Sequence, residues 1–75
     1  MFVKLDDATI LDMSTGTCYR YSRRQGGSEM RITFNGPQLD KFCSGAIADG
    51  LWRWLNIAAM KFDEVQIALD KALAQ

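Results

Sequence analysis

Residues 30–37 read Met-Arg-Ile-Thr-Phe-Asn-Gly-Pro, and they mark the point where predicted strands give way to predicted helices. In the first part of this stretch apolar and polar side chains alternate, which is typical of a strand with one buried face. The Asn-Gly-Pro sequence then ends the strand, and proline fits the first turn of a helix because its missing N–H would be unpaired there. The chain is therefore predicted to be α+β, with a β-meander in residues 1–35 and a helical half in residues 36–75.

The residues before this boundary predict a small antiparallel meander of about four strands. The candidate strands are residues 2–5, 9–13, 17–23 and 30–34. Turn-forming residues separate them, and the Gln-Gly-Gly-Ser sequence at residues 25–28 is the strongest loop signal in the chain. The third candidate strand is rich in the β-branched and aromatic residues that suit a pleated surface.

Beyond the boundary, apolar residues recur at helical spacing through residues 37–61, and they include Leu39, Cys43, Ala46, Ile47, Leu51, Trp54 and Ala58. We expect one helix, or two pieces with a break at Ser44-Gly45, because glycine inside a helix costs about 0.5–1 kcal/mol relative to alanine. An alternative interpretation makes residues 38–42 a fifth strand and begins the helix at Ser44. With the helix that follows, two or three helices would pack on one face of the sheet.

The last helix carries a set of start signals around Asp63. An aspartate at the N-cap accepts a hydrogen bond from the free amides of the first turn, and Gln66 is placed to complete a capping box. Phe62 would pack on Ile67 as a hydrophobic staple. The predicted helix begins at Asp63 and buries an apolar face made of Val65, Ala68, Leu69, Ala72 and Leu73.

Length and composition predict a single domain, residues 1–75, with a small core that gains from extra burial. The chain has no histidine, and Cys18 and Cys43 lie too far apart in sequence for a CxxC motif, so we expect no metal and no cofactor. The first residues lack an export signal, which favours a cytoplasmic location and reduced thiols over a Cys18–Cys43 bridge. No apolar run is long enough to span a membrane.

The same composition argues against catalysis. Without histidine, neither a Ser-His nor a Cys-His dyad can form. Asp6, Asp7 and Asp12 are the only local cluster of carboxylates, and a solvated turn explains them better than acid–base chemistry, which needs a cleft to shift pKa values. We therefore expect a protein that is not an enzyme.

Arginine and tyrosine are concentrated in the predicted hairpin, and the set is Tyr19, Arg20, Tyr21, Arg23, Arg24 and Arg31. The favoured interpretation is an edge hairpin that its charges keep soluble and unpaired. The alternative is a nucleic-acid-binding or regulatory accessory protein, in which the arginines contact phosphates and the tyrosines stack on bases. A formal net charge of zero argues against a general nucleic-acid binder.

The tryptophans lead to the favoured functional hypothesis. On a helix, Trp54 falls with Ile47 and is expected to face the core, whereas Trp52, Ile57 and Met60 lie toward the flank. This is more apolar surface than one sheet face can cover, and tryptophan is enriched where protein surfaces associate. The sequence thus predicts a small non-enzymatic protein-interaction module that forms a homodimer or binds an unidentified protein partner.

Overall fold

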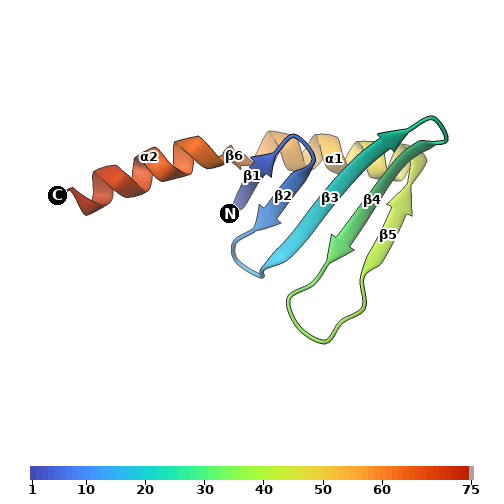
Figure 1. Ribbon diagram of the computed structural model, residues 1–75, viewed down its shortest axis with the longest axis horizontal. Coiled ribbons are helices and arrows are strands. Elements are labelled where there is room, and N and C mark those ends of the chain that lie inside the picture. Colours follow the sequence, from blue (N-terminus) through green and yellow to red (C-terminus); the bar gives the residue numbers. More distant parts are fainter. Residues whose placement is uncertain (75) are drawn as a thin grey trace.

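Six strands and two helices make up the protein in the computed structural model, which describes residues 1–74 (Figure 1). The elements in chain order are β1 (Phe2–Asp6), β2 (Thr9–Asp12), β3 (Thr17–Arg24), β4 (Gly27–Thr33), β5 (Lys41–Ser44), α1 (Gly45–Ala58), β6 (Met60–Lys61) and α2 (Phe62–Leu73). The α+β prediction is confirmed. The sheet has two strands more than the four that the sequence indicated, and the helices number two.

The strands form one mixed sheet in the order β5-β4-β3-β2-β1-β6. Neighbours from β1 to β5 are antiparallel, so the predicted meander is confirmed and β5 extends it at one edge. At the other edge the two-residue β6 runs parallel to β1. This short strand connects α1 to α2 and pairs with the edge of the sheet at β1.

The helix predicted over residues 37–44 is wrong. Residues 41–44 form β5 instead, with Cys43 opposite Met30 and Lys41 opposite Ile32, and α1 begins at Gly45. The alternative interpretation had the right kind of element and placed the strand a few residues early. Pairing with the exposed edge of β4 satisfies the backbone groups of β5, and this outweighs the helical spacing of a few apolar residues.

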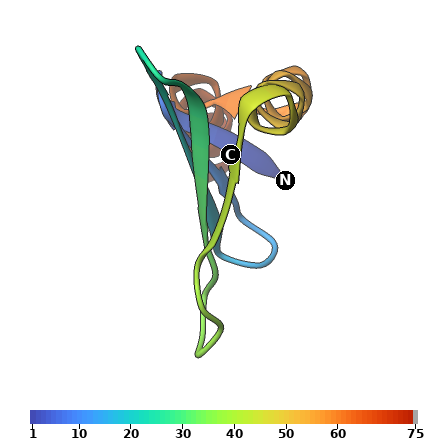
Figure 2. The ribbon, with the colours of Figure 1, turned by 90° about the vertical axis from the view of Figure 1, so that its right-hand side faces the viewer.

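The core lies between one face of the sheet and α1 (Figure 2). Ile10 on β2 and Met30 on β4 are fully buried, as are Ala48 and Leu55 on α1. Around this cluster pack partly buried side chains of the same face and helix: Phe2, Tyr19, Tyr21, Ile32, Cys43, Leu51, Trp52 and Ala59. The opposite face of the sheet carries no helix across its β3–β5 half.

The predicted orientation of α1 is wrong. Trp54 was expected in the core, but 55% of its surface is exposed, and Ile47 is exposed as well. Trp52 takes the inward place and stacks on Tyr21, with ring centroids 5.1 Å apart and planes 3° from parallel. Apolar residues surround most of this helix, so periodicity alone could not select the inward face.

The predicted start of α2 is also wrong. The helix begins at Phe62, its N-cap is Lys61, and no side chain caps it. Asp63 lies inside the first turn, and Gln66 donates its side-chain hydrogen bond to Asp70 rather than reaching back to the cap. The staple has no basis, because Phe62 is itself a helical residue and not the residue before the cap. Instead of covering the sheet face, α2 projects beyond the β6 edge (Figure 1).

The two cysteines are free and cannot form a bridge. Cys18 on β3 and Cys43 on β5 are separated by the intervening strand β4. The strand register also places the two cysteines on opposite faces of the sheet. On β4, Cys43 lies opposite Met30 and Cys18 lies opposite Thr33. Met30 and Thr33 are three residues apart, and side chains an odd number of residues apart on a strand point to opposite faces. A disulfide requires Cα atoms within about 7 Å and Cβ atoms facing each other.

Candidate functional site

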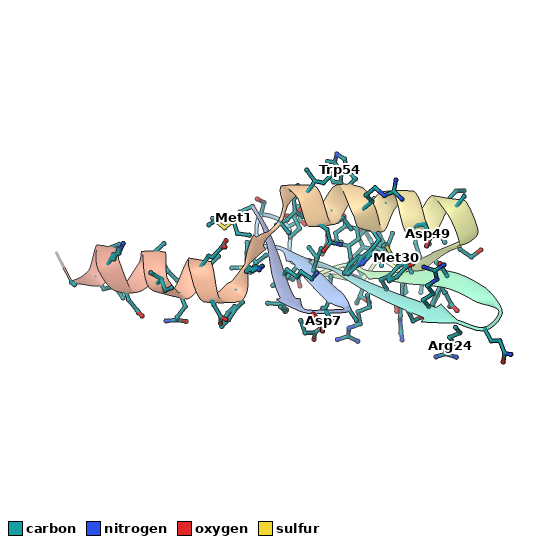
Figure 3. All side chains as sticks on the ribbon, turned by 90° about the horizontal axis from the view of Figure 1, so that it is seen from above. Met1, Asp7, Arg24, Met30, Asp49 and Trp54 are labelled. Carbon is teal, nitrogen blue, oxygen red and sulfur yellow. The ribbon has the colours of Figure 1, made fainter. Side chains whose placement is uncertain are left out.

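Apolar side chains are exposed along the side of α1 that faces away from the sheet. We call Ile47, Trp54 and Ile57 the outer α1 surface, because all three are exposed. Helical spacing places Ile57 opposite the buried Leu55 and turns Ile47 and Trp54 to the flank of the helix. Figure 3 shows Trp54 pointing away from the sheet. Its ring meets the edge of Phe2, with centroids 5.5 Å apart, which fixes the indole at the surface.

The predicted interface residues do not stay together. Ile57 and Met60 are exposed, whereas Trp52 is half-buried beneath α1 against Tyr21. Lys4 also holds Trp52 in place, since its ammonium lies 5.9 Å from the ring centroid and donates a 2.7 Å hydrogen bond to Asn56. Trp54 takes the outward position that sequence reasoning had given to Trp52.

A second apolar surface, largely uncovered, runs along α2. We call Phe62, Val65, Leu69, Ala72 and Leu73 the α2 stripe, because these five residues fall on one side of the helix. None of the twelve residues of α2 is buried. A helix of this length is marginal in water by itself, because its order normally comes from packing an apolar side against something else.

The polar side of α2 is acidic. Asp63, Glu64 and Asp70 outnumber Lys71, its only basic residue. On α1, the exposed charge next to the outer α1 surface is Arg53. The two uncovered helical surfaces therefore carry opposite charges at their margins.

The tyrosines of the hairpin lie under α1. Tyr21 donates a 2.5 Å hydrogen bond to Asp49 on α1, and its hydroxyl oxygen lies 3.1 Å from that of buried Ser28. Tyr19 packs against the core, and burial raises the pKa of its phenol. Both rings are occupied in tying β3 to the helix, so neither presents a free face for base stacking.

Asp49 is held in its charged form at the centre of this contact. Hydrogen bonds from Ser28 and Tyr21 lower the pKa of its carboxyl group, and the positive charges of Arg23 and Arg53 lower it further. Arg23 thus lies on the helix-covered side, where it balances Asp49.

The remaining hairpin arginines lie on the open face of the sheet. Arg20 and Arg24 alternate with Tyr19 and Tyr21 along β3, so their side chains leave on the side away from α1. Arg31 lies directly opposite Arg20 on β4, and its guanidinium pairs with Asp40 at 2.6 Å. The tyrosines and these arginines, predicted to act together, are separated by the thickness of the sheet.

The structure adds an aromatic residue that sequence reasoning missed. Phe42 on the edge strand β5 lies opposite Arg31, with the guanidinium carbon 5.7 Å from the ring centroid. The sequence predicts a helix at this position, or a strand without a defined partner, and neither places Phe42 beside Arg31. A shallow hollow of about 240 Å³ lies here, lined by Arg20, Tyr21, Ser22, Arg24, Glu29, Arg31 and Phe42.

The acidic cluster at the N-terminal end forms two turns. The amide of Ala8 donates to Asp6 at 2.8 Å, and the amide of Ser14 donates to Asp12 at 2.9 Å. These backbone hydrogen bonds are the main reason that the pKa of each carboxyl group is lowered. These two carboxylates therefore hold the turns that follow β1 and β2.

Within residues 1–74, no three side chains of the types that ligate metals gather at one place. Neither of the helices in this part of the chain is long and apolar enough to cross a membrane. Comparisons with protein-family models, with curated proteins and with solved structures found none that matches the chain.

Proposed function

We propose that this protein is a non-enzymatic interaction module that associates with a second copy of itself through its helical half. The observation that carries the proposal is α2, an amphipathic helix of twelve residues with none of them buried. Such a helix needs a surface to cover its stripe, because a short helix gains little from its own hydrogen bonds in water.

A second copy offers that surface in the outer α1 surface. The α2 stripe and the outer α1 surface lie on successive segments along the long axis of the molecule, so one chain does not cover one with the other (Figure 1). A two-fold axis would place α2 of each copy on α1 of its partner, as a symmetric interface requires. The acidic margin of α2 would then meet the exposed Arg53 of the other copy.

The free energy of burying these apolar side chains can offset the cost of bringing two chains together. Burial of one large apolar side chain contributes about 1.5–3 kcal/mol, and two-fold symmetry counts each residue twice. Leu69, Leu73, Trp54 and Ile57 therefore supply an amount comparable with the cost of about 4–15 kcal/mol for bringing two chains together. The proposal includes a cytoplasmic location, because two unbridged cysteines suit a reducing compartment.

Sedimentation equilibrium at micromolar concentration tests the proposal with a matched pair of variants. Leu69 in the α2 stripe and Ile67 on the other side of α2 are 54% and 56% exposed, so an aspartate at either site is equally tolerated by the isolated fold. Leu69→Asp should give a monomer, and Ile67→Asp should leave the dimer intact. Trp54→Asp should also give a monomer, with far-UV circular dichroism confirming that each variant is folded.

Three results would contradict the proposal or a part of it. A wild-type protein that stays monomeric across this range would remove self-association. Equal weakening by Leu69→Asp and Ile67→Asp would show that α2 does not contribute through its stripe. A dimer that survives Trp54→Asp would overturn the part assigned to the outer α1 surface.

A further inference from the structure

The open face of the sheet is basic over its β3–β5 half, although the whole chain is neutral. Residues 17–44 contain five of the nine basic residues and two of the nine acidic ones. Arg20, Arg24 and Arg31 all lie on the side that α1 leaves uncovered. Register places the other two cations, Arg23 and Lys41, on the α1 side. The open face therefore carries three of the five cations, together with Glu29 and the Asp40 that pairs with Arg31.

The placement of these arginines is unfavourable for the fold alone. Arg20 and Arg31 are directly opposed across β3 and β4, and like charges in that position destabilise a sheet. Arg31 has Asp40 as a counter-ion, and this is the only ion pair within residues 1–74. Arg20 lies near enough to Asp6 for its charge to lower the pKa of that carboxyl group, but the two form no direct ion pair, and Arg24 forms none. Local choices that oppose the fold are expected at functional sites.

An exposed aromatic ring completes the surface. Phe42 is 60% exposed on the edge strand and lies beside Arg31 at the rim of the hollow that Arg20 and Arg24 also line. Glu29 lines the same hollow and opposes anion binding, so the site suits a ligand with several weak phosphate contacts rather than one tightly held ion.

We propose that this open face binds single-stranded nucleic acid, with Arg20 and Arg24 on the phosphates and Phe42 stacked on a base. Exposed aromatic rings on a basic groove bind unpaired bases regardless of sequence, because every base has a flat face. A duplex keeps its bases stacked and cannot offer one to Phe42. This inference does not depend on self-association, which uses the helical half of the chain.

Fluorescence anisotropy with a labelled oligothymidine, measured from about 50 to about 200 mM salt, tests the proposal. Arg20→Ser and Arg24→Ser should each weaken binding and reduce the salt slope by about 0.7, the value for one phosphate contact to a single strand. Phe42→Ala should weaken binding about fivefold to a hundredfold. The matched control is Lys71→Ser on the polar side of α2, which removes one positive charge elsewhere and should leave the affinity within about twofold.

Folding provides an independent readout for Arg20. Arg20→Ser removes both the like-charge contact with Arg31 and the weaker attraction to Asp6, so its thermal midpoint should stay close to that of the wild type, and weaker binding would not reflect unfolding. Absence of binding at about 50 mM salt would overturn the proposal, as would equal effects of Lys71→Ser and Arg20→Ser. Tighter binding of a duplex, or of a phosphorylated peptide, would overturn the assignment to single strands.

Discussion

Leu55→Ala is expected to remove a large part of the free energy of unfolding. Leu55 is fully buried between α1 and the sheet, in the cluster with Ile10 and Met30. The change deletes the equivalent of three methylene groups, worth about 2.4 kcal/mol of transfer free energy, and the cavity left behind adds to this. The expected loss is about 3–4 kcal/mol, against about 4–11 kcal/mol for a chain of this length.

Urea unfolding followed by far-UV circular dichroism measures this loss, and Leu39→Ala is the matched control. Leu39 is 87% exposed in the loop before β5, so the same chemical change should alter the free energy of unfolding by less than about 0.5 kcal/mol. If Leu55→Ala leaves too little folded protein, Ile10→Val should still cost about 0.5–1.5 kcal/mol. Equal costs for Leu55→Ala and Leu39→Ala would refute the packing described here and favour the helix once predicted over residues 37–44.

Three further outcomes follow from particular contacts. Asp49→Asn should lower the thermal midpoint at neutral pH, and this loss should shrink below about pH 4. The pKa of Asp49 is lowered in the folded protein, so its charged carboxylate stabilises the fold at neutral pH and stops doing so once it is protonated. Gly16→Ala should lower the midpoint by at least about 4 °C, since φ is +76° and the added Cβ would lie 2.9 Å from Asn35, whereas Gly26→Ala should not. Thiol titration after anaerobic unfolding without reductant should find both cysteines free, and an intramolecular loss of two hydrogens would contradict the assigned strand order.

The meander could be predicted because its signals are local. Alternation in residues 30–34 and the glycine-rich turn depend on neighbours in sequence, and the structure has both a strand and a turn there. The turn is shorter than the predicted 25–28, because β4 begins at Gly27 and runs to Thr33. β5 and β6 could not be predicted with the same means. Each is short, and each exists because a distant strand, β4 or β1, leaves an edge that it can pair with.

The helices show a second limit. Helical periodicity indicated α1 but not which of its sides would be buried. Trp54 and Trp52 lie on two apolar sides that overlap, and the side with Trp52 and the small Ala48 is the one that packs on the sheet. The cap signals at Asp63 were outweighed by β6, which fixes Lys61 in an extended conformation and starts α2 directly after it.

The sequence could predict the arginines of the candidate nucleic-acid surface but not its aromatic residue. Strand alternation was sufficient to separate Arg20 and Arg24 from Tyr19 and Tyr21, and applying it would have excluded the tyrosines from a shared surface. Phe42 could not have been found, because its position depends on the register of β5 against β4.

The dependence of α2 on a second copy is tested most directly by amide hydrogen exchange of Phe62–Leu73 at several protein concentrations. If a second copy covers α2, protection of these amides should rise with concentration across the range where the dimer forms, while protection in β3 and β4 changes little. Protection of α2 that is strong at every concentration, in a protein that sediments as a monomer, would contradict it, since the helix would then be ordered without any partner to cover its stripe.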